Sequence, residues 1–289
     1  MEKPEPAFTY SQLERSRWNV LDLITIVSKD AVPATVFCDV DMEWVKELKR
    51  EFRKKGIRLT ETAIFLKAIA TAQASFPASR SLALPFGLLA VLERICGGFT
   101  VERFVDGKPA VFFGTIDEPH KKDLQAIMQE LITFSDNSIV NQPELNTEHR
   151  FSKMPWLVRQ LIIRMAMVMP RLRLQITRAS FGLSSLGKYG VTAITGPCVC
   201  TSTFGIGVIE DRPIVRNGEI VIRPTMTLSL LFDQRCIDGS EAARFLTQVK
   251  HLLEGGLKRH VSEISKKRME TPGTMPKEST EYMESIHTK

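Results

Sequence analysis

The stretch "LLFDQRCIDGSEAARFL", residues 230–246, has the features of a strand, a turn and a helix in succession. It begins as an apolar strand, passes through an Asp-Gly pair and continues as a helix with Ala and Leu on one side. Polar side chains at such a turn are well placed for chemistry. The polar residue at this position, Gln234, neither takes up nor releases a proton near neutral pH. The stretch by itself therefore fits either an active site or the remains of one.

The composition is that of a globular protein. The chain has 289 residues, of which 43% are hydrophobic and 25% charged, enough for a sizeable core. The net charge of +6 would suit an acidic ligand, an acidic partner or an anionic membrane. The basic residues are interspersed with Glu and Asp and form no recognised nucleic-acid motif, so no nucleic-acid partner is expected.

The cysteines suggest neither a disulfide framework nor a metal site. They are odd in number and form no CxxC pair. The five are Cys38, Cys96, Cys198, Cys200 and Cys236.

The N-terminal residues lack the apolar core of a signal peptide, and no uninterrupted apolar run of about 18 residues occurs. These features predict a cytoplasmic protein with no metal and no membrane-spanning segment.

Hydrophobic periodicity and turn residues predict alternating helices and strands in one domain. The expected domain covers 12–265, with a flexible arm at 1–11 and a disordered tail at 266–289. Helices are expected at 13–29, 42–55, 61–75, 120–135 and 240–254. Strands are expected at 34–42, 180–187, 202–209 and 218–233, with a hairpin over 99–116 and a loop at 137–151. Turns are expected at Asp106-Gly107, Gly187, Gly190 and Asn217-Gly218.

The segment 154–176 mixes long apolar side chains with arginines at 159, 164, 171 and 173. This pattern fits a helix packed on the core, and it also fits a helix that lies on a membrane surface. Both alternatives stay open at this point, and the second makes 154–174 a candidate for peripheral membrane contact.

Three stretches carry a resemblance to a known family. They are "FGLSSLGKYGVTAIT" (181–195), "IGVIEDRPIVRNGEIVIRPTMTLSLLFDQRCIDGSEAARFL" (206–246) and, more weakly, "FCDVDMEWVKELKREFRKKGIRLTETAIFLKAIA" (37–70). They resemble the catalytic domain of the acyltransferase component of 2-oxo-acid dehydrogenase complexes, in the superfamily that includes chloramphenicol acetyltransferase. The resemblance implies an α/β fold, a two-layer sandwich with a mixed β-sheet and helices on one face. The family's lipoyl and subunit-binding modules have no counterpart in this sequence, so we expect a stand-alone protein without a covalent lipoyl site.

The resemblance also implies a reaction. Family members pass an acyl group between the coenzyme A thioester and an acceptor thiol or hydroxyl, with a His of the His-x-x-x-Asp-Gly motif as general base and a Ser hydroxyl that stabilises the oxyanion. By resemblance this serine is Ser184, and Gln234 stands where the family has its His. General-base catalysis contributes roughly 100- to 10,000-fold, and an amide cannot supply it, although it can still form hydrogen bonds.

Asp238 matches the Asp of the motif, whose implied role is a structural salt bridge with an arginine near the start of the domain. Arg17 is the nearest candidate, and Arg15 is the next. If the pair is buried, removing one member should cost roughly 3–5 kcal/mol. Because Asp238 precedes Gly at a strand-to-helix turn, it is also expected to accept hydrogen bonds from the first amides of the helix.

Other residues are weak candidates to replace the missing base. Cys236 lies two residues after Gln234, so its thiolate could act as a nucleophile if its pKa were lowered, or it could be a small buried hydrophobe. Cys198 and Cys200 are interpreted as small buried hydrophobes. The histidines lie outside the motif, and those at 251, 260 and 287 are expected on the surface.

Two functions remain possible from the sequence. The first is a coenzyme-A-dependent acyltransferase with weakened or altered chemistry, acting on an acyl thioester and a small-molecule or carrier-bound acceptor. The second is a catalytically silent relative that serves as a trimeric binding or scaffold protein. In both, the resemblance implies a homotrimer in which Ser184 faces Gln234 of the partner subunit.

Overall fold

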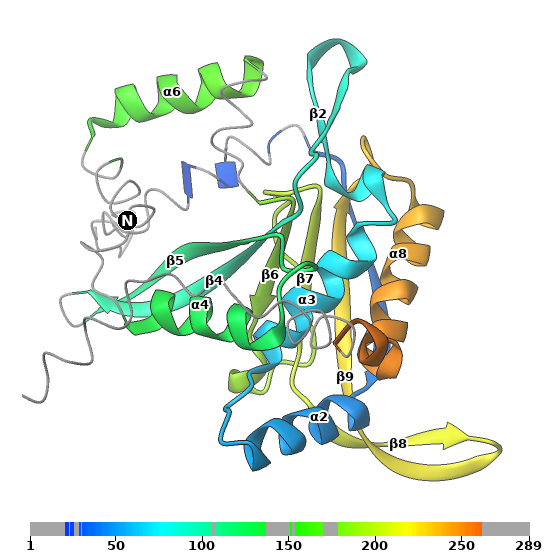
Figure 1. Ribbon diagram of the computed structural model, residues 1–289. Coiled ribbons are helices and arrows are strands. Elements are labelled where there is room, and N and C mark those ends of the chain that lie inside the picture. The colour runs from blue at the N-terminus through cyan, green and yellow to red at the C-terminus, as the bar shows by residue number, and fades with distance from the viewer. Residues whose placement is uncertain are drawn as a thin grey trace, which may run out of the picture.

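The computed structural model describes residues 21, 22, 24, 25, 29, 31–105, 108–136, 151, 154–169 and 179–261. The predicted arm and tail lie outside the described residues, as do most of the predicted helix at 13–29 and nearly all of the predicted loop at 137–151. Within the described part, the predicted mixed α/β architecture is confirmed (Figure 1).

A seven-stranded mixed sheet forms the centre of the fold. Its order is β1-β9-β7-β6-β4-β5, and β8 pairs only with β9. The strands of the main path are β1 (Pro33–Asp41), β9 (Glu219–Asp233), β7 (Ser202–Ile206), β6 (Phe181–Ser185), β4 (Cys96–Val105) and β5 (Lys108–Asp117). The pairs β4–β6 and β6–β7 are parallel and the others are antiparallel. Each strand predicted from the sequence coincides with one of these strands.

Four helices cover one face of the sheet (Figure 1). They are α2 (Glu43–Lys54), α3 (Glu61–Gln73), α4 (Leu124–Asp136) and α8 (Gly239–His251). The predicted helix starts follow from capping: Thr60 accepts a hydrogen bond from the third amide of α3, and Asp123 accepts one from Ala126 N at 2.7 Å. Helix α3 is almost wholly buried, which places it at the centre of the core.

Strand alternation divides the sheet into two unlike faces. The residues that face the helices are large and apolar, and they include Phe99, Phe181, Leu183, Phe204 and Leu230. The intervening residues of the same strands point to the opposite face. Around Ser184 these are small or polar: Thr100, Gly182, Ser184, Thr203, Gly205 and Ser229; Leu231 of β9, opposite Thr203, lies on the same face. None of the four helices covers this second face, which is the side of the sheet that carries Ser184 (Figure 1).

The segment 191–200 lies against part of this second face. The Ser229 hydroxyl donates a hydrogen bond to the carbonyl oxygen of Ile194. A Cβ atom added at Gly205 would collide with the side chain of Ile194 and with the Ser229 hydroxyl. A side chain at position 205 is therefore excluded by close packing.

We expect Gly205→Ala to destabilise the protein by about 1–3 kcal/mol, because the added methyl group overfills a packed contact. The matched control is Gly196→Ala, since a Cβ at Gly196 meets open space and its backbone is not left-handed. Chemical denaturation of both variants measures the difference. Equal unfolding midpoints would show that the 191–200 segment does not pack against β7 as described.

The hairpins of the structure agree only in part with those predicted from the sequence. Val105 pairs with Lys108, so β4 and β5 are joined by two residues, as predicted. Asn217 and Gly218 both have positive φ, 53° and 84°, which suits the tight turn predicted between strands. Three strands were not predicted: β8 (Glu210–Arg216) and the short hairpin of β2 (Ser81–Ala83) and β3 (Leu89–Val91). The charged residues and the proline of β8 hide its strand pattern.

Candidate functional site

Ser184 lies on β6, half-buried, on the sheet face that the helices leave open. Its neighbour on β7 is Gly205, which in turn opposes Ser229 of β9. On the other side, β4 runs parallel to β6 with Phe99 opposite Leu183, so Thr100 is the next residue beside Ser184. The serine hydroxyl thus stands among glycine and small hydroxyl side chains, and the 191–200 segment covers the side toward Gly205 and Ser229.

A charged cluster borders this serine. Glu102 continues β4 on the same face, and its carboxylate accepts hydrogen bonds from Lys188 Nζ at 2.7 Å and from Tyr189 OH at 2.6 Å. The bond from Lys188 and then that from Tyr189 hold the pKa of Glu102 below its usual value. Glu102 is therefore a poor base. The sequence analysis missed this cluster, whose only signal is that residues 102 and 184 fall on the same face of neighbouring strands.

Asp233 holds the turn that follows β9. Its carboxylate accepts hydrogen bonds from Arg235 N at 3.1 Å and Val32 N at 3.2 Å, and it pairs with the Arg235 guanidinium at 2.6 Å. Burial alone would raise the pKa of Asp233, but the hydrogen bonds from Arg235 and Val32 outweigh it and lower the pKa. Gln234 follows with an exposed side chain and a backbone N–H that donates to Val32 O at 2.9 Å. The buried carboxylate of this motif is thus Asp233, which the sequence analysis did not single out.

Asp238 caps helix α8, as predicted. Its Oδ1 accepts hydrogen bonds from Glu241 N at 2.8 Å and from Ser240 Oγ at 2.7 Å, and the Glu241 N–H is the main reason that its pKa is lowered. In the single chain the side chain turns outward to reach the amides of its own helix and is exposed, so the condition that Asp238 is buried is not met there. The predicted partners, Arg17 and Arg15, lie outside the described residues.

This geometry changes the expected cost of removing Asp238. We expect Asp238→Ala to lower the free energy of unfolding by about 1 kcal/mol, the usual loss for an N-cap, instead of the larger loss of a buried ion pair. Gln234→Ala, which removes an exposed neutral side chain, should leave stability within about 0.5 kcal/mol of the parent. Denaturant titration of both variants measures this. A loss of several kcal/mol for Asp238→Ala would instead reveal a buried partner.

Within one chain, Ser184 and Gln234 are far apart. The pairing places Ser184, Gly205 and Ser229 on one line across three strands. Gln234 is five residues further along β9, beyond its end. Two strand spacings of about 4.8 Å and five residues of about 3.3 Å each put the two residues roughly 20 Å apart. The two side chains cannot act on one substrate atom unless they come from different chains.

The alternative nucleophile and base candidates gain no support. Burial raises the pKa of the Cys236 thiol, which favours Cys236 as a small buried residue over a reactive thiolate. Burial raises the pKa of Cys198 to about 11 in the same way. His251 and His260 are exposed, as expected. Among the described residues, no group of three or more His, Cys, Asp or Glu side chains could hold a metal ion.

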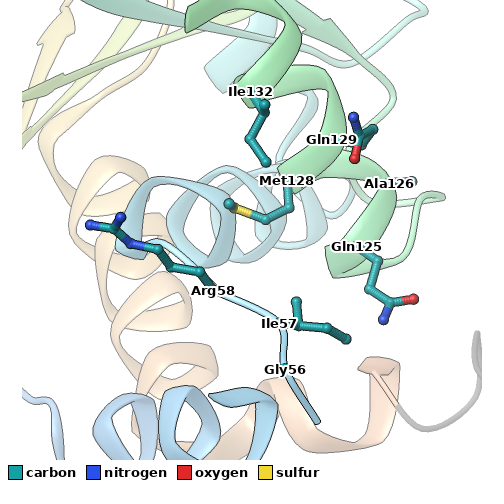
Figure 2. Close-up of a pocket in the computed structure, with 8 residues that line it drawn as sticks. All are labelled: Gly56, Ile57, Arg58, Gln125, Ala126, Met128, Gln129 and Ile132. Atoms are coloured by element: carbon teal, nitrogen blue, oxygen red, sulfur yellow. The ribbon is translucent and has the colours of Figure 1, made fainter. Parts of the chain in front are cut away.

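A surface pocket lies on the helix side of the molecule. Figure 2 shows Met128 and Ile132 of α4 above the chain segment 56–58. Its polar lining consists of Arg58 and two glutamines of α4. Because none of Ser184, Gln234 and Asp238 lines this pocket, it is separate from the candidate site.

The fold is shared with solved dihydrolipoamide acetyltransferases. A dihydrolipoamide acetyltransferase from Azotobacter vinelandii superposes with a TM-score of 0.64 at 22% identity, covering 86% of this chain and 92% of that one. The roles of a serine, a histidine and an asparagine in its catalytic mechanism have been investigated. A probable dihydrolipoamide acetyltransferase from Listeria monocytogenes superposes with a TM-score of 0.63 at 19% identity, covering 86% and 96%. At these identities the likeness establishes the fold, as predicted.

Sequence comparison adds a resemblance to a family. Residues 172–260 match the family model of the 2-oxoacid dehydrogenases acyltransferase (catalytic domain), which confirms the predicted resemblance. The succinyltransferase component of the 2-oxoglutarate dehydrogenase complex of Escherichia coli (strain K12) is 23% identical over 84% of this chain and 53% of its own length. Its counterpart in Pseudomonas aeruginosa is 42% identical over 27% of this chain and 20% of its own length. The chain therefore spans about half the length of the Escherichia coli relative, which it matches over most of its own length.

Proposed function

We propose that this protein transfers acyl groups from a coenzyme A thioester to an acceptor at a site built between two copies of the chain. The observation that carries the proposal is the position of Ser184: its hydroxyl lies on the helix-free face of the sheet, within the segment that matches the acyltransferase family model. The residues beside it on β4, Thr100 and Glu102, are exposed and leave that side of the face for a substrate and for a second subunit.

The role of Ser184 follows from the chemistry of acyl transfer. When the acceptor attacks the thioester carbonyl, negative charge develops on the carbonyl oxygen of the tetrahedral intermediate. A serine hydroxyl can donate a hydrogen bond to that oxygen without changing its own protonation state. When the intermediate collapses, the carbon–sulfur bond breaks and the coenzyme A thiolate leaves. Ser184 therefore serves as oxyanion donor and not as nucleophile.

The absence of a base restricts the acceptor. Gln234 of the partner subunit would orient the acceptor through its amide but would not take its proton. A thiol has a pKa near 8.5, so a few per cent is already thiolate at neutral pH, whereas an alcohol has almost no anion there. A thiol acceptor is therefore favoured over a hydroxyl, and the transfer rate should rise with pH toward the pKa of the acceptor.

The separation of about 20 Å between Ser184 and Gln234 within one chain requires a second subunit. The small residues of the helix-free face would form the contact, and by resemblance the assembly is a trimer. Light scattering should give three times the mass of the chain at micromolar concentration. A monomer would mean that the proposed site is never assembled.

The test of activity is direct. The purified protein is incubated with acetyl-, succinyl- and longer acyl-coenzyme A thioesters and a small dithiol, and free coenzyme A thiol is separated and measured. Turnover that disappears in Ser184→Ala supports acyl transfer. Thiol release that is the same with and without the protein for every thioester contradicts it.

A second function is favoured by one residue. Because Gln234 cannot act as a base, a catalytically silent trimer that binds ligands or scaffolds other proteins has the same structural requirements. In that case calorimetry should show coenzyme A binding without turnover, or no binding at all. Turnover above the uncatalysed rate would exclude the silent alternative.

A further inference from the structure

Helix α6 (Trp156–Val168) exposes an apolar face. It stands apart from the sheet and its covering helices (Figure 1). Leu157 and Leu161 are 71% and 60% exposed, and Val158 and Met165 are also exposed. At 100° per residue these four positions fall on one side of the helix. The exposed side is thus a continuous apolar surface of four side chains, which we call the α6 face.

The opposite side of α6 is anchored. Arg159 is 4% exposed and forms an ion pair with Asp22 at 3.1 Å, and Gln160 donates a hydrogen bond to Asp22 at 2.7 Å. Ile163 and Ala166 are buried on this same side. The orientation of the helix is therefore fixed, and the α6 face is turned outward by specific contacts on its other side.

The charge around α6 has one sign. Residues 151–178 contain six basic residues and no Asp or Glu, and Arg159 is the one that pairs with Asp22. Arg164, at the margin of the α6 face, is exposed. An apolar helix face with a tryptophan at one end and an exposed arginine at its margin, in a basic stretch of the sequence, is the pattern of a helix that lies at an anionic lipid interface.

The length of α6 excludes a membrane-spanning role. Its 13 residues extend about 20 Å, less than the roughly 30 Å of a bilayer core. Within the residues that the structure describes, no helix is long and apolar enough to cross a membrane. A lipid contact through α6 would lie in the plane of the surface.

We propose that the α6 face docks on an anionic lipid surface, with Leu157, Leu161 and their neighbours entering the headgroup region and Arg164 facing the lipid phosphates. The sequence left open a helix packed on the core and a helix on a membrane surface. In the structure no described residue of α6 belongs to the core cluster; the buried side of α6 is held by Asp22, and the other side is left for lipid. This docking does not depend on acyl transfer, so its test needs no turnover.

The test is co-sedimentation of the full chain with two kinds of vesicle: pure phosphatidylcholine, and phosphatidylcholine with about one third phosphatidylglycerol. We expect pelleting with the anionic vesicles only, reduced by salt, and a loss of at least about ten-fold in the variant that carries Leu157→Gln and Leu161→Gln. The matched control carries Val215→Gln and Ile220→Gln, which change equally exposed apolar residues, 71% and 77%, on the β8–β9 hairpin. The control should pellet like the parent.

The other outcomes overturn the proposal. Equal binding to both vesicle types would remove the anionic requirement. Equal loss in the control would mean that any exposed apolar side chain suffices. If neither vesicle type pellets the parent, the α6 face is not a lipid site, and light scattering then identifies its occupant. A smaller mass in the Leu157→Gln, Leu161→Gln variant would assign the face to contact between copies, and an unchanged mass would leave a protein partner.

Discussion

We expect Gln234→His to raise the rate of acyl transfer by about 10²- to 10⁴-fold over the parent protein, the contribution that a positioned general base makes. Gln234 is exposed at the end of β9, and its backbone is held by Val32 and by the turn around Asp233. An imidazole at this position should therefore be carried by the same rigid turn without a steric cost. With coenzyme A thiol release as the measurement, the gain should follow the neutral imidazole and appear as pH rises through about 6.5.

Two controls separate this gain from other effects. The double variant Gln234→His with Ser184→Ala should lose about 10²- to 10³-fold of the gain, because the oxyanion donor is missing. Gln234→Asn, which keeps an amide, should stay at the level of the parent. A Gln234→His protein that forms a trimer but shows no gain would mean that position 234 does not face Ser184 of the partner subunit. The proposed site would then be wrong.

Much of the fold could be predicted because its strands and helices are marked by short sequence patterns: apolar residues that alternate along the strands, and capping residues at the starts of the helices. Phe181, Leu183 and Phe204 alternate with small residues, which identifies half-buried strands. Thr60, Asp123 and Asp238 mark helix starts through the hydrogen bonds that their side chains accept. The strands of the β2–β3 hairpin were missed because three-residue strands are too short for a period to show.

The site was less predictable because its geometry depends on strand order. The sequence indicates Ser184 and Gln234, but only the pairing of β6, β7 and β9 shows that roughly 20 Å separates them in one chain. Glu102 comes beside Ser184 only because β4 is the neighbour of β6. The sequence also could not distinguish the roles of Asp233 and Asp238. Asp233 precedes the turn and Asp238 follows it, and only the structure shows which of the two carboxylates is buried.

Asp233→Ala should be among the most damaging single substitutions in the motif, with an expected loss of about 2–4 kcal/mol in the free energy of unfolding. The carboxylate is buried and has three partners: the guanidinium and the N–H of Arg235, and the N–H of Val32. Its removal leaves a half-buried cation and two backbone donors without their acceptor. Asp238→Ala, which removes an exposed cap from the same turn, is the matched control and should cost about 1 kcal/mol.

The pH dependence gives this prediction a second test. The pKa of Asp233 is lowered in the folded protein, so its contribution to stability is complete above the unfolded value of about 3.9 and is lost as pH falls through the folded pKa. The stability difference between the parent and Asp233→Ala should therefore be constant from pH 8 to about 5 and narrow below about 4. A difference that stayed constant down to pH 2 would mean that the carboxylate does not act as an anion, and that the turn before Gln234 is held by packing alone.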